Sequence, residues 1–132
     1  MSVTCPYCHR PAKLATGANI YPHRPDLVDK VFWRCAPCDA YVGCHPKHRK
    51  WSPTGTTPLG RLANAELRRE KQRAHAAFDP LWKSGEMRRT EAYKWLAEQL
   101  GMSAANCHIG MLDANACRAV VAAVQCLQRR AA

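Results

Sequence analysis

Short apolar runs and turn-forming residues alternate through the first third of the chain. β-branched and aromatic residues concentrate at 31–34 and again at 40–44. Residues 12–15 and 19–21 are further strand candidates, on either side of the turn-forming pair Thr16–Gly17. Each run is too short to be stable as an isolated strand. The pattern therefore predicts three or four short antiparallel strands that need an additional source of stability.

The second half of the chain is rich in alanine and carries the residue types that begin and end helices. Asn, Asp, Thr and Asp–Pro favour helix starts, and a glycine is typical of a helix end. Gly101 is such an end, and Ser103 precedes a short turn. The starts lie at Asn64, Asp79–Pro80, Thr90 and Asp113, which predicts helices over 64–77, from 80, over 90–100 and over 113–128.

These patterns divide the chain into three parts. Residues 1–46 form a small β-rich ribbon, residues 47–61 form a basic connector rich in proline, glycine and threonine, and residues 62–132 form a helical domain. A chain of 132 residues can hold one compact unit or two small ones. We therefore expect an α+β fold in which an N-terminal ribbon packs on a C-terminal bundle of three to four helices.

Two Cys-x-x-Cys pairs lie in the ribbon, separated by residues 9–34. Two intervening residues make a tight turn that aims both thiolates at one ion, and two such turns complete a tetrahedral shell. Four thiolates leave no open position for a substrate, so the predicted zinc is structural. Binding of the ion would stabilise a segment that is poor in large apolar residues. The expected ligands are Cys5, Cys8, Cys35 and Cys38.

Other readings of the eight cysteines are weaker. A thioredoxin-like redox pair needs a βαβ context, which the pattern lacks. Reduced core thiols explain Cys117, which lies in the apolar stripe of the last predicted helix. A second metal site is a possible but disfavoured alternative. Its candidate ligands are Cys44, His45, His48, Cys107 and His108.

The chain is strongly basic. Twenty Lys and Arg residues against ten Asp and Glu give a formal charge of +10, which favours a polyanionic partner. Trp51 lies among the basic residues of the connector, where its ring can stack on a base. The competing reading is a solvated basic surface with a packed tryptophan. The expected phosphate contacts are Lys47, Arg49, Lys50, Arg68, Arg69 and Arg73.

His75 and Asp79, four residues apart on a predicted helix, form the only pair that suggests acid–base chemistry. Such a pair more often fixes the end of a helix. The sequence contains no phosphate-binding loop, catalytic triad order or carboxylate cluster. It therefore favours a binding protein over an enzyme, and we expect no catalytic residues.

Several longer strings resemble a known family. The chain is similar, over nearly its whole length, to the zinc-finger-containing domain family of unknown function that occurs in phages and bacteria. The resemblance implies zinc and a mobile-element setting, and it assigns no activity to particular residues. The strings that carry it are residues 5–8, 21–27, 35–46, 58–60, 74–82, 92–97 and 107–110.

Three function classes follow from these features. The leading one is a zinc-binding, nucleic-acid-associated protein, binding either DNA or RNA directly or a complex that processes them. The second is a phage-type protein that binds and modulates a host protein, in an anti-defence or adaptor role. The third is a metal-dependent nuclease that would use His45, His48, His75 and Asp79.

The sequence also bears on location. No apolar run approaches the ~20 residues that cross a bilayer, and residues 1–5 lack the charged and apolar regions of a secretory signal. We therefore expect a cytoplasmic protein with no membrane partner. In a reducing compartment, cysteines serve as metal ligands and buried thiols rather than disulfides.

Overall fold

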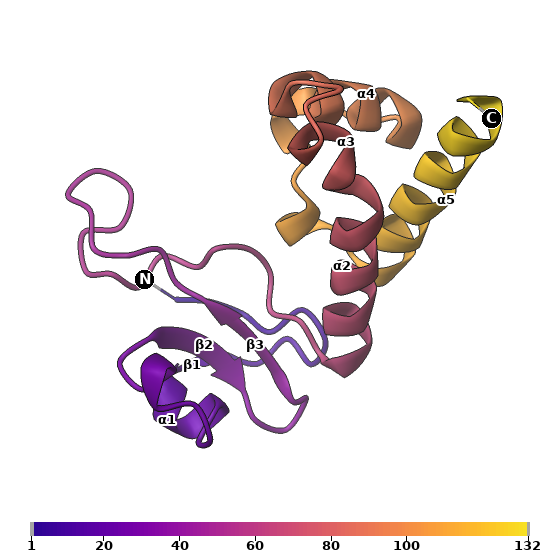
Figure 1. Cartoon of the computed structure of the whole chain (residues 1–132). Helices are drawn as coiled ribbons and strands as arrows, with labels where there is room; N and C mark the ends of the chain where they lie inside the picture. The colour runs from indigo at the N-terminus through magenta and orange to yellow at the C-terminus, as the bar shows by residue number, and fades with distance from the viewer. Residues whose placement is uncertain (1, 132) are drawn as a thin grey trace. The chain divides into compact units, whose positions relative to one another are not determined.

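A computed structural model describes residues 2–131 of the chain (Figure 1). It divides the chain into two compact units, Met1–Ala65 and Glu66–Ala132. The first unit holds an antiparallel sheet and the second holds the longer helices. The predicted α+β class is thereby confirmed, with three strands near the N-terminus and four helices after them.

The sheet of the first unit has three antiparallel strands in the order β1-β2-β3. They are β1 (Lys13–Thr16), β2 (Val31–Cys35) and β3 (Ala40–Gly43). The β-branched and aromatic runs predicted both β2 and β3. Side chains alternate between the two faces, as they must in a strand. Trp33 and Cys35 of the central strand are buried on one face.

One predicted strand is wrong. Residues 19–21 lie in and after the short helix α1 (Gly17–Ile20), which is followed by the 3-10 turn η1 (Pro25–Leu27). The side-chain Oδ1 of Asn19 accepts hydrogen bonds from the N–H and the hydroxyl of Thr16, at 3.1 and 3.2 Å. A cap of this kind favours a helical turn over an extended chain.

The core of the first unit is small. Its fully or nearly fully buried apolar residues include a single tryptophan and a single leucine, and the rest are cysteines and alanines. Leu62, at 1% exposure, and Trp33, at 7%, are the only large side chains in it. The buried residues are Cys5, Ala12, Trp33, Cys35, Ala40 and Leu62.

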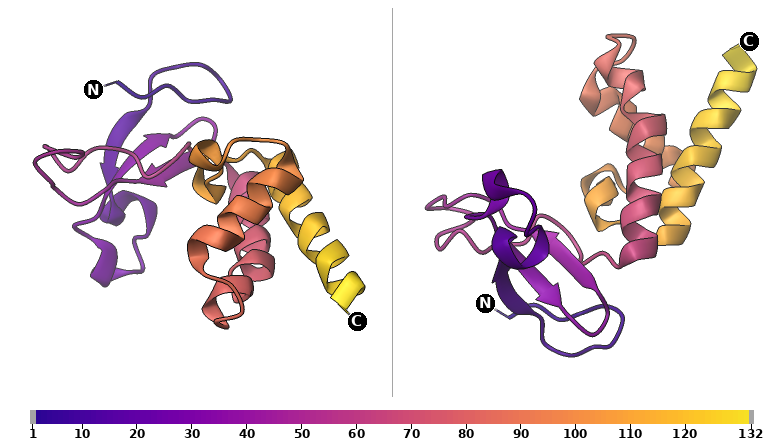
Figure 2. Two further views of the ribbon diagram at one scale, coloured as in Figure 1. Left: turned by 90° about the horizontal axis from the view of Figure 1, so that it is seen from above. Right: turned by 60° about the horizontal axis from the view of Figure 1, so that its bottom comes forward.

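Four helices and two 3-10 turns build the second unit. The first and last of these helices lie close together near their starts, where Arg118 pairs with Glu66, and they diverge toward their ends (Figure 2). No helix within residues 2–131 combines the length and the apolar character that crossing a bilayer requires. The elements are α2 (Ala65–Phe78), α3 (Pro80–Lys83), α4 (Arg89–Leu100), η2 (Ala104–Asn106), η3 (Ile109–Met111) and α5 (Ala114–Ala131).

The helix boundaries agree with the predicted signals at most places. Asp113 caps α5, because its Oδ1 accepts the Ala116 N–H at 2.8 Å. Gly101 ends α4 in the left-handed conformation, with φ 65°. The predicted start at Thr90 is wrong: α4 begins at Arg89, and Arg88 is its N-cap. The Arg88 carbonyl accepts the Ala92 N–H at 2.9 Å, and no side chain caps the helix there, since arginine has no acceptor atom.

The core of the second unit is larger and more apolar than that of the first. It draws side chains from every long helix and from the 3-10 turn η3. The ring of Phe78 contacts the ring of Tyr93 edge-on, with centroids 4.7 Å apart. The buried residues are Leu67, Ala74, Phe78, Ala92, Leu96, Ala97, Cys107, Ile109, Leu112, Cys117, Val120 and Val124.

Candidate metal centre and basic loop

The first cysteine pair lies in a tight turn near the N-terminus. Thr4 and Pro11 form an antiparallel bridge on either side of it. The Cys5 N–H donates to the Arg10 carbonyl, and the His9 N–H donates to the Cys5 carbonyl, both at 2.9 Å. His9, which follows the pair, has a left-handed backbone with φ 62°. The turn therefore folds back on itself directly after its second cysteine.

The second pair repeats this arrangement between β2 and β3. Cys35 is the last residue of β2, and Ala40 begins β3. Asp39, directly after Cys38, has a left-handed backbone with φ 50°, and its N–H donates to the Ala36 carbonyl at 3.1 Å. The residue directly after the second cysteine thus has a left-handed backbone in both turns.

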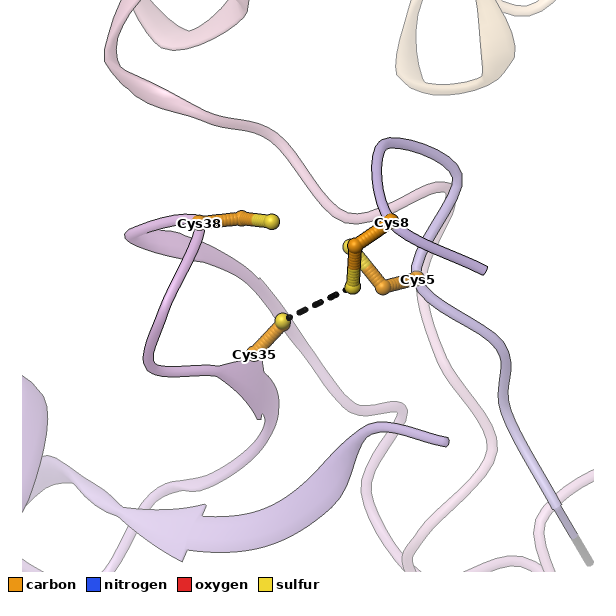
Figure 3. A group of neighbouring side chains, drawn as sticks. All are labelled: Cys5, Cys8, Cys35 and Cys38. Carbon is orange, nitrogen blue, oxygen red and sulfur yellow. Dashed lines mark hydrogen bonds between the residues drawn. The ribbon is translucent and has the colours of Figure 1, made fainter. Parts of the chain in front are cut away.

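The two turns bring four sulfur atoms together (Figure 3). The Sγ atoms of Cys5, Cys8, Cys35 and Cys38 all lie within 4.8 Å of one another. The Sγ atoms of Cys8 and Cys35 are 3.6 Å apart. This separation is too long for a disulfide and all eight cysteines are free thiols. Tetrahedral zinc with Zn–S bonds of about 2.3 Å places its sulfurs about 3.8 Å apart. The cluster therefore has the size of a four-thiolate metal site.

Crowding of the thiols affects their ionisation. A hydrogen bond from the Arg10 backbone N–H lowers the pKa of Cys8 to about 7. Burial, together with the neighbouring thiols, raises the pKa of Cys38 to about 12. The Cys8 thiolate thus forms readily, whereas ionisation of the Cys38 thiol beside it is disfavoured. A divalent cation among the sulfurs would offset that charge, so the donor set fits a metal ion.

Within residues 2–131, this is the only group of three or more His, Cys, Asp or Glu side chains arranged to hold a metal ion. The other predicted candidates have different surroundings. Cys44 packs against the core of the first unit, and the ring of His48 stacks on Trp51. Burial raises the pKa of both Cys44 and Cys107, which keeps these thiols protonated at neutral pH.

The basic residues of the predicted connector lie in a long loop that returns to β3. Its ends meet where Cys44 bridges to Pro58. Next to this bridge, the His45 N–H donates to the Thr57 carbonyl at 2.8 Å. We call residues 45–57 the basic loop; it projects away from the three strands (Figure 1). It belongs to the first unit of the chain.

Internal hydrogen bonds hold the basic loop in place. Trp33 of β2 donates its indole N–H to the Thr56 carbonyl at 2.6 Å. Ser52 is fully buried, and its hydroxyl donates to the His45 carbonyl at 3.1 Å. The loop is therefore an ordered structure attached to the sheet.

The tip of the basic loop presents a pair of stacked rings. His48 and Ser52 pair as an antiparallel bridge, with N–H···O distances of 2.7 and 3.0 Å, so residues 49–51 form the turn. The rings of His48 and Trp51 lie parallel within 8°, with centroids 3.4 Å apart. Trp51 is nevertheless 57% exposed. The sequence pointed to Trp51, but its partner was not predicted; the spacing His48-x-x-Trp51 inside a hairpin turn is the signal that could have revealed it.

The predicted phosphate contacts fall in both units. Lys47, Arg49 and Lys50 are exposed on the basic loop. Arg68, Arg69 and Arg73 lie on α2 of the second unit. Arg69 and Arg73 are exposed and Arg68 is half-buried. The guanidinium of Arg73 is 3.6 Å from the carboxylate of Glu70.

The predicted acid–base pair does form. Nδ1 of His75 lies 3.2 Å from a carboxylate oxygen of Asp79 at the end of α2. Nζ of Lys83 is 4.0 Å from the same carboxylate. Both partners of Asp79 are cations or can become cations, so the arrangement is that of a helix-end ion pair. Neither His75 nor Asp79 belongs to a metal-binding cluster among the described residues.

Comparison with known proteins gives one match. No curated protein and no solved structure matches the chain significantly. A model of the family described as a zinc-finger-containing domain matches residues 1–127. This match covers both the four-cysteine cluster and the helical unit. The chain therefore belongs to the zinc-finger-containing domain family.

Proposed function

We propose that the chain is a zinc-binding protein in which Cys5, Cys8, Cys35 and Cys38 hold one structural Zn²⁺. Family membership and the four clustered sulfurs support this proposal. A closed shell of four thiolates leaves no position for a substrate or water, so the ion serves the fold and not a reaction. The core of the first unit contains few large side chains, and the ion compensates for this deficiency.

Metal analysis of the purified protein tests this assignment. We expect about one zinc per chain, as the four-thiolate site requires. The variants Cys8→Ser and Cys38→Ser should lose most of the bound zinc. Cys126→Ser is the matched control, because Cys126 is a half-buried thiol of the second unit outside the cluster. Full zinc retention by the Cys8 and Cys38 variants would contradict the assignment.

We further propose that the protein binds nucleic acid through the basic loop. The observation that carries this proposal is the exposed stack of Trp51 on His48 at the tip of a loop with three cations. Aromatic rings that bases can stack on, beside a positive groove or loop, are how many proteins bind single strands. Lys47, Arg49 and Lys50 would contact phosphates on either side of the stacked base.

The cations of α2 would add to this binding. Arg68, Arg69 and Arg73 belong to a helix with five Lys, Arg and His residues between 66 and 75, against two glutamates. Such a helix attracts a phosphate backbone without reading its sequence. The phage or bacterial setting that the sequence resemblance implies is consistent with a protein that handles nucleic acid.

Salt-dependent binding to single-stranded DNA and RNA is the direct test. The double variant Arg49→Gln/Lys50→Gln should bind more weakly and show a shallower dependence on salt. The control is Arg129→Gln/Arg130→Gln, which removes the same charge from the end of α5. Trp51→Ala should cost about 1–3 kcal/mol of binding free energy. Binding that ignores salt, or equal losses in both double variants, would contradict the role of the loop.

A further inference from the structure

A cavity of about 450 Å³ lies on the first unit, beside the second cysteine pair. It is separate from the basic loop, because no residue of 45–57 lines it. Strand β1 forms one wall through residues 13–15. Arg34 and Cys35 of β2 and the next two residues, Ala36 and Pro37, also line it. The rest of the lining comes from Arg10, Pro11 and Asn19.

Three cations line this cavity, and no carboxylate does. Arg10, Lys13 and Arg34 form no ion pair with any described residue. Lys13 and Arg34 stand directly opposite each other on neighbouring strands. Side chains in such a pair have Cβ atoms about 4.5–5.5 Å apart, and like charges there destabilise a sheet. These three cations therefore have no carboxylate partner among the described residues.

The remaining polar side chain of the lining is also a donor. Asn19 uses its Oδ1 to accept hydrogen bonds from Thr16 at 3.1 and 3.2 Å. Its amide NH₂ group is the part left to interact with a ligand. Two guanidinium groups, one ammonium and one amide thus offer hydrogen-bond donors, and Cys35, a candidate metal ligand, also belongs to the lining. Apolar surface from Pro11, Leu14 and Pro37 fills the rest of the lining, and Leu14 is 51% exposed.

We propose that this cavity is a phosphate-binding site. A phosphate group carries several acceptor oxygens, and guanidinium groups bind pairs of them bidentately. Three cations can therefore share one group, which also relieves the repulsion between Lys13 and Arg34. The cavity is larger than a phosphate ion alone, so it has space for an attached sugar or base over the apolar part.

Two sources can supply the phosphate: the backbone of a nucleic-acid strand, or a small phosphate ester. We favour the nucleic-acid strand, because the cavity and the basic loop belong to the same unit. A phosphate bound in the cavity would add a second contact between that unit and the nucleic acid. This choice of source rests on the proposed nucleic-acid function. The phosphate site itself does not, since it follows from the lining of the cavity.

The experiment uses the zinc-loaded full chain and two probes. The first is inorganic phosphate, titrated against chloride at equal ionic strength while amide NMR signals are followed. The second is an unstructured oligonucleotide, whose affinity is measured as a function of salt. Each probe is applied to the wild type, Lys13→Gln, Arg34→Gln and the control Lys30→Gln, which removes an exposed charge of the first unit outside the cavity.

Phosphate should shift the amide signals of residues 13–15 and 34–36 in the wild type and the control, and several-fold more weakly in the two cavity variants. Oligonucleotide affinity should also fall several-fold in the cavity variants, with the slope of log K against log salt reduced by roughly 0.7–0.9 for each lost contact. Unchanged zinc content and circular dichroism show that the variants are folded.

Other outcomes separate the possibilities. Phosphate shifts that persist while the oligonucleotide binds all four proteins equally would support the site and assign it to a small phosphate ester. The same shifts without any oligonucleotide binding would support the site and overturn the nucleic-acid function. The phosphate site would be overturned if phosphate shifted the amide signals of the cavity no more than chloride does. Equal phosphate shifts in the wild type and all variants would overturn it as well.

Discussion

His9 and Asp39 show what the cysteine turns require of single residues. Each follows the second cysteine of its pair and adopts a positive φ, which residues with a side chain rarely do. Histidine and aspartate are among the side chains that tolerate this conformation best. The reversal after Cys8 also brings the Arg10 N–H to the Cys8 sulfur, which lowers the pKa of that thiol. The conformation of the turn therefore also lowers the pKa of the candidate metal ligand Cys8.

Substitution of His9 tests this constraint. A β-branched residue is strained at φ 62°, so His9→Val should lower the free energy of unfolding by about 1–3 kcal/mol. His9→Gly is the control, because glycine adopts positive φ without strain. Urea unfolding of the zinc-loaded proteins measures both changes. A His9→Val protein as stable as the glycine variant would show that the turn relaxes to another conformation.

At the scale of elements, Gly17 positions helix α1 against the turn η1. Its N–H donates to the Lys30 carbonyl at 2.9 Å, and it is buried. A Cβ atom placed on Gly17 would lie 1.6 Å from the carbonyl oxygen of Leu27. This is a contact with backbone, which cannot rotate aside as a side chain can. Only glycine therefore fits between the two elements.

Gly17→Ala should consequently displace η1 and destabilise the first unit by about 1–3 kcal/mol, which is the usual cost of overpacking. Gly43→Ala is a matched control on β3, since its added Cβ would meet the flexible Leu59 side chain at 3.4 Å. Thermal unfolding compares the two variants. Equal melting temperatures would mean that residues 25–27 move away at little cost.

The sequence predicted some of these elements well and others poorly, for physical reasons. The spacing of the cysteines gave both turns, and the β-branched runs gave β2 and β3, because these signals are local. Helix α1 was missed because a side-chain bond from Asn19 to Thr16 outweighs the apolar run that follows. The attachment of the basic loop to the sheet was also missed. It depends on contacts between residues far apart in the chain, such as Trp33 with Thr56.

At the scale of the whole molecule, the two units depend on different forces. Two of the six buried apolar residues in the core of the first unit are the candidate ligands Cys5 and Cys35. The second unit buries three leucines, an isoleucine and a phenylalanine among other apolar side chains. Burial of apolar area stabilises it without a metal. Under the proposed zinc binding, the ion would serve the same purpose in the first unit.

Removal of the metal should therefore affect the units unequally. A strong chelator should unfold the first unit and remove its tertiary near-ultraviolet signal from Trp33. The helical far-ultraviolet signal of α2, α4 and α5 should largely remain, and a single thermal transition from the second unit should persist. Loss of all helical signal on chelation would show instead that the two units unfold as one.

The structure of the basic loop affects how its exposed side chains can evolve. Backbone hydrogen bonds and the buried Ser52 hold the loop closed, and the side chains of Arg49 and Lys50 are exposed at its tip. Exchange of those two side chains leaves the framework intact. Mutations at the tip can therefore change which target the loop prefers without destabilising the fold.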